Sequence, residues 1–139
     1  MLFPKKVKHR KWQKKRVNPA KKSIEYRGTT LAFGSYGLKA ITAHRLNSNQ
    51  IESARRVAKR ASGKTGRVWT RIFPDRPYTR KAAEVGMGKG KGEPKGYEFE
   101  VKPGRILFEV DGVTEEVAKE SLRKAGKKLP LKTKIITRG

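Results

Sequence analysis

A short segment of the chain alternates glycine with lysine: Gly86-Met87-Gly88-Lys89-Gly90-Lys91-Gly92. Glycine lets the backbone adopt φ > 0 and approach another surface closely, and lysine places a charge on a long, flexible stem. Both properties suit contact with phosphate groups. A flexible, solvated surface loop is the alternative, and it would be preferred if the segment stood alone. The basic character of the rest of the chain favours contact with a nucleic acid.

The charge of the whole chain indicates a polyanionic partner. Its 139 residues include 36 Lys and Arg but only 12 Asp and Glu, which gives a formal net charge of +24 and a pI near 10.8. Charge of this density destabilises a compact state unless a polyanion neutralises it, and a pI above about 9 is typical of nucleic-acid-binding domains. An anionic membrane surface would require a basic amphipathic helix with an apolar opposite face. No segment fits that pattern, so we expect no membrane partner.

The first 28 residues form the most basic part of the chain, with 11 basic residues, one acid and a net charge of +10. They contain too few apolar residues to offset the entropy of ordering, so we interpret residues 1–28 as an extended arm. A disordered, solvated tail is the alternative. Aromatic side chains among the lysines could stack on bases while the cations bind phosphates. The candidate RNA-binding residues of the arm are Lys5, Lys6, Lys8, Arg10, Lys11, Trp12, Lys14, Lys15 and Arg16.

A helix is predicted from about Ser48 to Ala61, at the start of the domain formed by residues 29–139. Asn47 can cap it, with Gln50 completing a capping box. The side chains on its apolar face are mostly small alanines, so the helix can lie close on a sheet. The rest of its surface is basic and could lie along an RNA backbone or could simply be solvated. Its candidate RNA-binding residues are Arg55, Arg56, Lys59 and Arg60.

Alternation of apolar and polar residues predicts several strands. They cover residues 29–35, 38–44, 67–73, 97–102, 105–110 and 131–137, with a further strand starting at Tyr78. In the segment 67–73, the side chains of Trp69, Arg71 and Phe73 are expected on one side of the strand. Pro103-Gly104 predicts a hairpin between residues 97–102 and 105–110. The Gly/Lys loop occupies about 82–96. The candidate RNA-binding residues in and before this loop are Arg71, Arg76, Arg80, Lys81, Met87, Gly88, Lys89, Gly90, Lys91 and Gly92.

A second helix is predicted from about Glu115 to Ala125, with Thr114 as its N-cap and Gly126 ending it. Its inward stripe is expected to comprise Val117, Ala118, Ser121, Leu122 and Ala125. The predicted fold class is therefore α+β: a single domain with a mixed, mostly antiparallel sheet and two helices, plus the arm and the Gly/Lys loop. Residues 29–92 carry a net charge of +11, whereas residues 93–139 carry only +3. The first two thirds of the chain are therefore expected to meet the polyanion.

Motifs for catalysis or for cofactor and metal binding are missing from the sequence. It contains no cysteine, and His9 and His44 have no motif partners. Ser62-Gly63-Lys64-Thr65 resembles a phosphate-binding loop, but Ala58 stands where the first glycine is required. We therefore expect neither an enzyme nor a cofactor nor a metal site.

Seven collinear segments resemble the family of bacterial large-subunit ribosomal protein sixteen. The first is Met1-Leu2-x-Pro4-Lys5-Lys6-x-Lys8-x-Arg10-Lys11. The next are Phe33-Gly34-Ser35-Tyr36-Gly37-Leu38-Lys39-Ala40 and Gln50-Ile51-Glu52-Ser53-Ala54-Arg55-Arg56. The last four are Val68-Trp69-x-Arg71-Ile72-Phe73-Pro74-Asp75-x-Pro77, Met87-Gly88-x-Gly90-Lys91-Gly92, Lys102-Pro103-Gly104-x-Ile106-Leu107 and Lys128-Leu129-Pro130-Leu131-Lys132-Thr133. They cover nearly the whole chain in order.

The resemblance implies an α+β fold and binding to large-subunit ribosomal RNA near the peptidyl-transferase region. It further implies contact with transfer RNA in the aminoacyl site, neighbouring ribosomal proteins as partners, and a late role in subunit assembly. The protein would be ribosome-bound in the cytoplasm, with an organelle as the alternative location, and would not form homo-oligomers. The chain departs from the family at Gly86, where arginine is common and is hydroxylated in some members. A free-standing RNA chaperone remains the alternative function.

Overall fold

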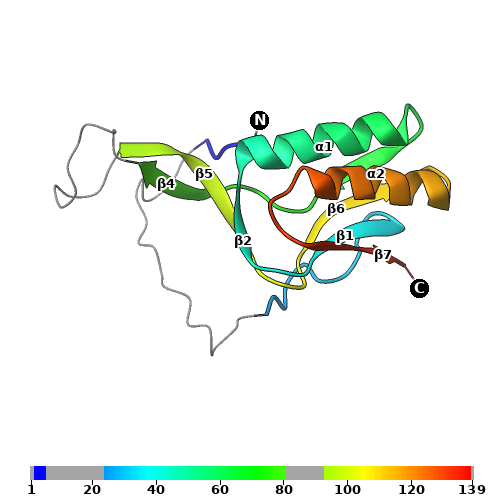
Figure 1. Cartoon of the computed structure of the whole chain (residues 1–139), viewed down its shortest axis with the longest axis horizontal. Coiled ribbons are helices and arrows are strands. Elements are labelled where there is room, and N and C mark those ends of the chain that lie inside the picture. Colours follow the sequence, from blue (N-terminus) through cyan, green and yellow to red (C-terminus); the bar gives the residue numbers. More distant parts are fainter. Residues whose placement is uncertain (1, 6–23, 81–92, 139) are drawn as a thin grey trace.

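The computed structural model describes residues 2–5, 24–80 and 93–138, with backbone alone described at 78–80 and 93–95. Within these ranges the chain forms seven strands and two helices, with the first helix after the second strand and the second helix before the last strand (Figure 1). No helix in the described ranges is long and apolar enough to cross a membrane. The predicted α+β class with two helices is confirmed.

The strands form two sheets, in which every described pairing is antiparallel. The four-stranded sheet has the order β3-β6-β1-β7 and comprises β1 (Tyr36–Ala40), β3 (Arg67–Thr70), β6 (Ile106–Asp111) and β7 (Thr133–Thr137). The three-stranded sheet has the order β2-β5-β4 and comprises β2 (His44–Asn47), β4 (Arg76–Arg80) and β5 (Glu93–Val101). β5 begins within the range 82–96 that was expected to be loop.

The predicted hairpin of residues 97–102 and 105–110 is wrong. β5 pairs with β2 and β4, whereas β6 pairs with β1 and β3. The turn between them binds the end of β1, because the Gly104 N–H donates to the Ala40 carbonyl (2.8 Å) and the Ala40 N–H donates to the Arg105 carbonyl (2.9 Å). Gly104 has φ of 102°, which suits glycine. The turn therefore carries the chain from one sheet to the other.

The strands expected at 29–35 and 38–44 also differ from the structure. Residues 29–35 form a loop, and the second range is replaced by β1, which ends at Ala40, and β2, which begins at His44. The backbone amides of residues 32–34 donate to a side-chain carboxylate rather than to a neighbouring strand. Alternation of apolar residues could not distinguish these two hydrogen-bonding partners.

Both helices begin where the sequence predicts. The capping box at α1 (Ser48–Ser62) is confirmed: Asn47 Oδ1 accepts from the Gln50 N–H (2.9 Å), and Gln50 Oε1 accepts from the Asn47 N–H (3.1 Å). Thr114 Oγ1 accepts from the Val117 N–H (3.4 Å) at the start of α2 (Glu115–Lys127). These caps satisfy amides that have no partner within the helix.

The expected end of α2 at Gly126 is wrong, since the helix continues through this glycine to Lys127. A Cβ atom at position 126 would lie 2.7 Å from Thr133 Oγ1 and 3.7 Å from Leu38 Cδ1. Glycine at this position therefore serves close packing of α2 on the four-stranded sheet. Val117, expected in the inward stripe, is instead exposed, while the other four residues of that stripe are buried.

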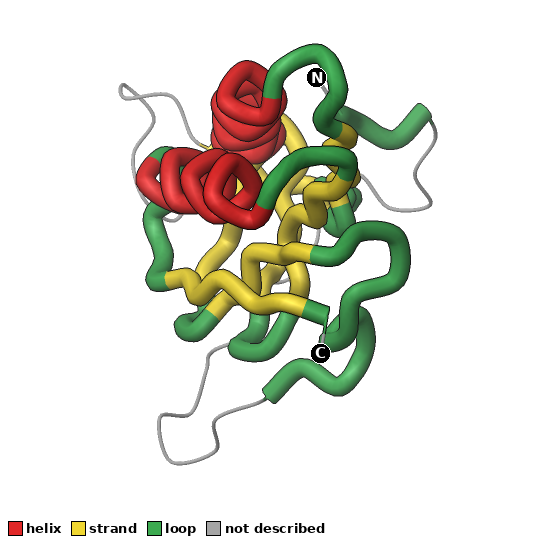
Figure 2. Tube along the Cα trace, turned by 90° about the vertical axis from the view of Figure 1, so that its right-hand side faces the viewer, coloured by secondary structure: helices red, strands yellow, loops and turns green. Residues whose placement is uncertain are grey.

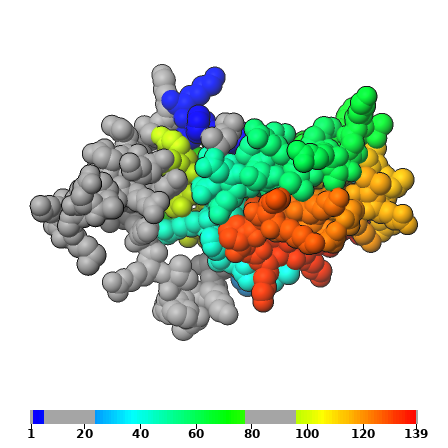
Figure 3. Space-filling model, turned by 45° about the horizontal axis from the view of Figure 1, so that its top comes forward, coloured from blue at the N-terminus to red at the C-terminus, as the bar shows by residue number. Residues whose placement is uncertain are grey.

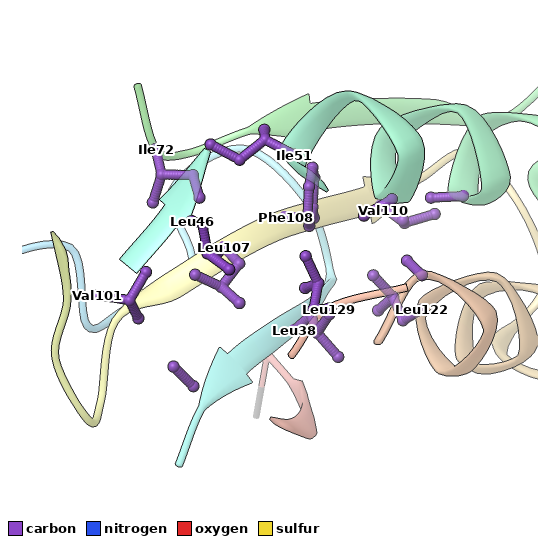
Figure 4. Close-up of a cluster of buried hydrophobic side chains, with 14 of the residues drawn as sticks. Leu38, Leu46, Ile51, Ile72, Val101, Leu107, Phe108, Val110, Leu122 and Leu129 are labelled. Atoms are coloured by element: carbon purple, nitrogen blue, oxygen red, sulfur yellow. The ribbon is translucent and has the colours of Figure 1, made fainter. Parts of the chain in front are cut away.

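The core lies between the helices and one face of the four-stranded sheet. The two helices pack side by side over that face (Figures 2 and 3). Small buried residues of α1 and α2 bring the helices close to the strands, while larger side chains fill the interior (Figure 4). These fully buried larger side chains include Leu38, Leu46, Ile51, Leu107, Phe108, Val110 and Leu122.

The ends of the predicted arm contact the domain. Leu2 packs against the core. The Glu25 N–H donates to the Pro103 carbonyl (2.9 Å), and the Ile106 N–H donates to the Gly28 carbonyl (2.8 Å). Residues 24–28 therefore join the turn after β5, while the domain boundary after residue 28 stays a prediction.

These contacts predict that a chain beginning at Ile24 is more stable than one beginning at Thr29. The shorter chain loses the two backbone hydrogen bonds to the turn, and each contributes about 0.5–1.5 kcal/mol. Urea unfolding followed by circular dichroism should give a difference of about 1–3 kcal/mol in the free energy of unfolding. Equal stability of the two chains would show that residues 24–28 do not support the fold.

Candidate nucleic-acid interface

The face of the four-stranded sheet opposite the helices carries a fully buried carboxylate, Glu109. Its neighbours along β6, Phe108 and Val110, belong to the core on the helix side. Successive side chains of a strand point to opposite faces, so Glu109 points away from the helices. It pairs in register with Trp69 of β3, which places both side chains on this second face.

Every oxygen of this carboxylate has partners. Oε1 accepts from the backbone N–H groups of Ala32 (2.9 Å), Phe33 (3.0 Å) and Gly34 (3.0 Å). Oε2 accepts from the Arg71 guanidinium at 2.5 Å. Burial alone would raise the pKa of Glu109, but hydrogen bonds from Gly34, Arg71, Phe33 and Ala32 together outweigh it and hold the pKa below its ordinary value. Glu109 is therefore ionised at neutral pH and fixes the 30–34 loop on the sheet.

Two glycines let this loop lie directly on the strands. A Cβ at Gly34 would lie 2.8 Å from the backbone oxygen of Val110. A Cβ at Gly37 would lie 2.3 Å from Leu31 Cδ2, so the absence of a side chain on β1 makes room for Leu31. The Phe33-to-Ala40 motif thus builds a close contact between a loop and a sheet.

The same loop holds an aromatic ring at the surface. Phe33 is 56% exposed and stacks on Trp69 with ring centroids 5.9 Å apart and an interplanar angle of 19°. The Arg71 guanidinium carbon lies 5.4 Å from the Phe33 ring centroid. Two rings and one cation therefore meet on the second face of the sheet.

The basic surface of α1 contains one acid, Glu52. Arg55 donates to both of its carboxylate oxygens, and Arg56 Nε donates to Oε1 at 3.3 Å. The hydrogen bond from Arg55 lowers the pKa of Glu52 to about 2, against the opposing effect of burial. The side chain of Arg56 nevertheless remains 69% exposed. Part of this positive surface is therefore neutralised, and part stays accessible.

The last two cations of α1 differ in their contacts. Lys59 Nζ donates to the carbonyl of Gly66 (2.5 Å), so it joins the helix to the loop that follows. Arg60 is exposed, and within the described residues it makes no hydrogen bond or ion pair. Arg56 and Arg60 are four residues apart and so lie on one face of the helix. They are the cations of α1 best placed to bind a phosphate.

Two predicted RNA ligands, Arg71 and Arg76, are held inside the protein. Arg71 pairs with Glu109, and its side chain is 18% exposed. Arg76 is buried and its Nη1 donates to Glu100 at 2.6 Å. The structure thus gives both arginines intramolecular carboxylate partners, and their contact with RNA stays a prediction.

A cleft of about 360 Å³ lies beside α1 and the end of β3. Arg105 lines it and donates through Nη2 to the Arg71 carbonyl (3.1 Å), with its guanidinium carbon 5.2 Å from the Phe99 ring centroid. Its Nε is buried and has no hydrogen-bond partner among the described residues. The other lining residues are Leu2, Glu52, Arg55, Thr70, Ile72, Phe73 and Asp75. Within the part of the chain that the structure describes, no group of His, Asp or Glu is arranged to hold a metal ion.

Most of the predicted arm and loop ligands lie outside the described residues. Lys5 is described and exposed, and Arg80 lies in β4 with only its backbone described. The residues outside the described ranges are Lys6, Lys8, Arg10, Lys11, Trp12, Lys14, Lys15, Arg16, Lys81, Met87, Gly88, Lys89, Gly90, Lys91 and Gly92.

Sequence reasoning did not select Phe33, Glu109 or Arg105 as site residues. Glu109 could have been found, because it is an acid flanked on both sides by apolar residues of β6 and such a charge needs a partner. The alternation in 67–73 did put Trp69 and Arg71 on one side. Nothing in the sequence indicated that Phe33 would lie over them, because this contact joins segments far apart in the chain.

The chain is similar to known ribosomal proteins along nearly its full length. Residues 4–136 match the family described as Ribosomal protein L16p/L10e. The chain is 53% identical over 138 residues to large ribosomal subunit protein uL16 of Maricaulis maris (strain MCS10), which covers 99% of this chain and 98% of that protein. It is also 53% identical over 138 residues to the protein of the same name from Azobacteroides pseudotrichonymphae genomovar. CFP2, covering 94% of that relative.

The geometry around Glu109 predicts that Glu109→Gln strongly destabilises the protein. The substitution removes the negative charge opposite Arg71 and places an NH₂ group among hydrogen-bond donors. Breaking a buried pair costs about 3–5 kcal/mol, and we expect a loss of this size in the free energy of unfolding measured with urea. Glu120→Gln is the matched control, since Glu120 forms an exposed ion pair with Arg123 and should matter little.

The pH dependence of the unfolding free energy should differ between the unmodified protein and Glu109→Gln. Because the folded-state pKa of Glu109 is lowered, its contribution is complete above its ordinary pKa of 4.5 and is lost as the pH falls through the folded-state pKa. The unfolding free energy of the unmodified protein should therefore decrease more steeply below about pH 4.5 than that of Glu109→Gln. Parallel curves would contradict the assignment of an ionised Glu109.

Proposed function

Because the chain belongs to the ribosomal protein L16p/L10e family, we propose that it is a structural constituent of the large ribosomal subunit and binds the RNA of that subunit. The observation that carries this proposal is the family match over residues 4–136. Membership of a ribosomal protein family also agrees with the prediction that the chain is not an enzyme. As a ribosomal protein, it acts in the cytoplasm, bound to the ribosome and to neighbouring ribosomal proteins.

The charge distribution supports RNA as the main partner. The net charge of +24 would oppose compact folding without a polyanion. Arg56 and Arg60 offer exposed cations on one face of α1. RNA contacts of this kind neutralise backbone phosphates, so they give affinity and orientation rather than sequence recognition.

A finer proposal concerns the arm and the Gly/Lys loop. We place both near the peptidyl-transferase region, where the arm residues from Lys5 to Arg16 bind ribosomal RNA and extend towards transfer RNA in the aminoacyl site. The loop from Met87 to Gly92 packs into RNA near the same centre, because its glycines allow close backbone approach and its lysines reach phosphates. The protein joins late in subunit assembly, when this RNA has taken shape. The resemblance of these segments to their family and their composition support the proposal.

A free-standing RNA chaperone is the second candidate, favoured by the dense positive charge of the arm. Fractionation at moderate salt separates the two functions. A subunit constituent sediments with the large subunit, whereas a chaperone held by charge alone is released, because its affinity falls steeply with salt.

The proposed role of the loop predicts that replacing Lys89 and Lys91 together by alanine weakens transfer-RNA binding in the aminoacyl site. Gly90→Val should be at least as harmful, because a β-branched side chain opposes φ > 0 and keeps the backbone from RNA. Both variants should be made as soluble protein, since such a loop adds little to a core. The measurement is binding of aminoacyl-transfer RNA by large subunits assembled with each variant.

The control for the loop variants is Lys119→Ala with Lys124→Ala on α2, because both of these lysines are exposed. This control removes the same charge from a region with little net positive charge and should leave transfer-RNA binding unchanged. Normal binding by both loop variants would make the loop a solvated connection and would overturn this part of the proposal.

The exposed arginines of α1 give a separate prediction for ribosomal RNA. Each phosphate contact contributes about 0.7–0.9 to the slope of log K against log salt concentration. Replacing Arg56 and Arg60 by alanine should therefore reduce this slope for large-subunit RNA by up to twice that amount. Arg123→Ala with Lys127→Ala on α2 has the same spacing and charge and should have a smaller effect. Equal slopes for the two double variants would exclude a specific role for α1.

A further inference from the structure

Phe33 is an exposed aromatic residue in a fixed position. Its side chain is 56% exposed, while its own N–H and those of Ala32 and Gly34 are bound by the buried Glu109 carboxylate. A large ring that is not packed into a core gains little for the fold from its exposed area. The backbone that carries it is nevertheless held by three hydrogen bonds.

The support beneath Phe33 comes from one extended segment. Trp69 and Arg71 are two residues apart, and the Arg71 N–H continues the ladder by donating to the Leu107 carbonyl (2.9 Å). Residues two apart in an extended segment point to the same side. Phe33 contacts both the Trp69 ring and the Arg71 guanidinium, so this segment supplies both of its neighbours on the sheet. Despite these two contacts, Phe33 remains 56% exposed, so part of its surface is accessible from solvent.

The chemistry of this surface favours stacking over charge attraction. The positive charge of Arg71 is already neutralised by Glu109. The surface formed by Phe33, Trp69 and Arg71 therefore presents aromatic rings rather than a net charge. Arg67, on the same side of the segment as Trp69 and exposed, offers a cation for an adjacent phosphate. Aromatic rings beside cations are the arrangement with which proteins bind unpaired nucleotides.

We propose that Phe33, supported by Trp69 and Arg71, is a stacking site for one unpaired nucleobase of RNA. The site deepens the proposed function and rests on it, because it assigns a particular contact to an RNA-binding protein. The base stacks on the solvent-accessible part of the Phe33 ring, and its backbone passes towards Arg67. Because Glu109 fixes the loop before RNA arrives, binding orders few protein groups and more of the stacking energy appears as affinity.

The test compares single-stranded and double-stranded RNA binding by the full-length chain. The probes are a short oligoadenylate and an RNA duplex of the same length, with affinity measured by fluorescence anisotropy. Phe33→Leu keeps an apolar side chain but removes the ring. It should weaken oligoadenylate binding by about tenfold, towards the lower end of the range for one stacked base, and should leave duplex binding and the salt dependence unchanged. Phe33→Tyr should restore the affinity, because it keeps the ring.

Two controls keep the result specific. Tyr26→Leu removes an aromatic side chain that is 81% exposed and makes no ring contact with another described residue, and it should not change oligoadenylate binding. Thermal unfolding should be the same for all three variants. If Phe33→Leu unfolds, Phe33→Met provides the same test.

The possible outcomes distinguish a failure of the proposed stacking site from a failure of the proposed function. If the unmodified protein binds oligoadenylate and Phe33→Leu binds it equally well, the stacking site is wrong while RNA binding stands, and the exposed ring is left as a contact for a neighbouring protein. Equal weakening of single-strand and duplex binding also overturns the site. If the unmodified protein binds neither RNA nor large subunits, the proposed function itself fails.

Discussion

The ionised, fully buried carboxylate of Glu109 is the interaction on which the second face of the four-stranded sheet depends. Removing such a charge from water is costly unless the protein supplies equivalent partners. Here three backbone amides and the Arg71 guanidinium supply them. The requirement therefore fixes the 30–34 loop on the sheet, brings Arg71 inside, and holds Phe33 over Trp69. This loop is thus held by the hydrogen bonds of one buried carboxylate together with the Phe33–Trp69 stack.

The described arginines fall into two groups, those with partners inside the fold and those exposed to solvent. Arg71 and Arg76 bind carboxylates within the fold, and Arg105 joins the turn and the end of β3 through backbone carbonyls. Arg56 and Arg60 remain exposed on α1. In a chain with 36 basic and 12 acidic residues, Glu109 and Glu100 determine that Arg71 and Arg76 become structural. Counting cations along the sequence therefore overestimates how many are exposed in the described part of the chain.

Local patterns predicted the elements well where the controlling interaction lies within a few residues. Asn47 and Gln50 form their capping box, and Thr114 caps α2, because each contact spans one turn of helix. The prediction failed where a distant partner decides. Gly126 was read as a helix end, yet it lies within α2 against Thr133. Residues 29–35 alternate as a strand does, but their amides bind Glu109, which lies about 75 residues away in the chain.

The sequence by itself determined the α+β class, the two helices with their N-caps, the basic character, and the resemblance to a ribosomal protein family. These follow from composition, periodicity and motifs, which are properties of neighbouring residues. Only the tertiary structure decided the division into two sheets, the partners of Arg71 and Arg76, and the stack of Phe33 on Trp69. Each of these depends on which segments meet across the fold, and a buried charge or an exposed ring acquires its role only from the groups brought against it.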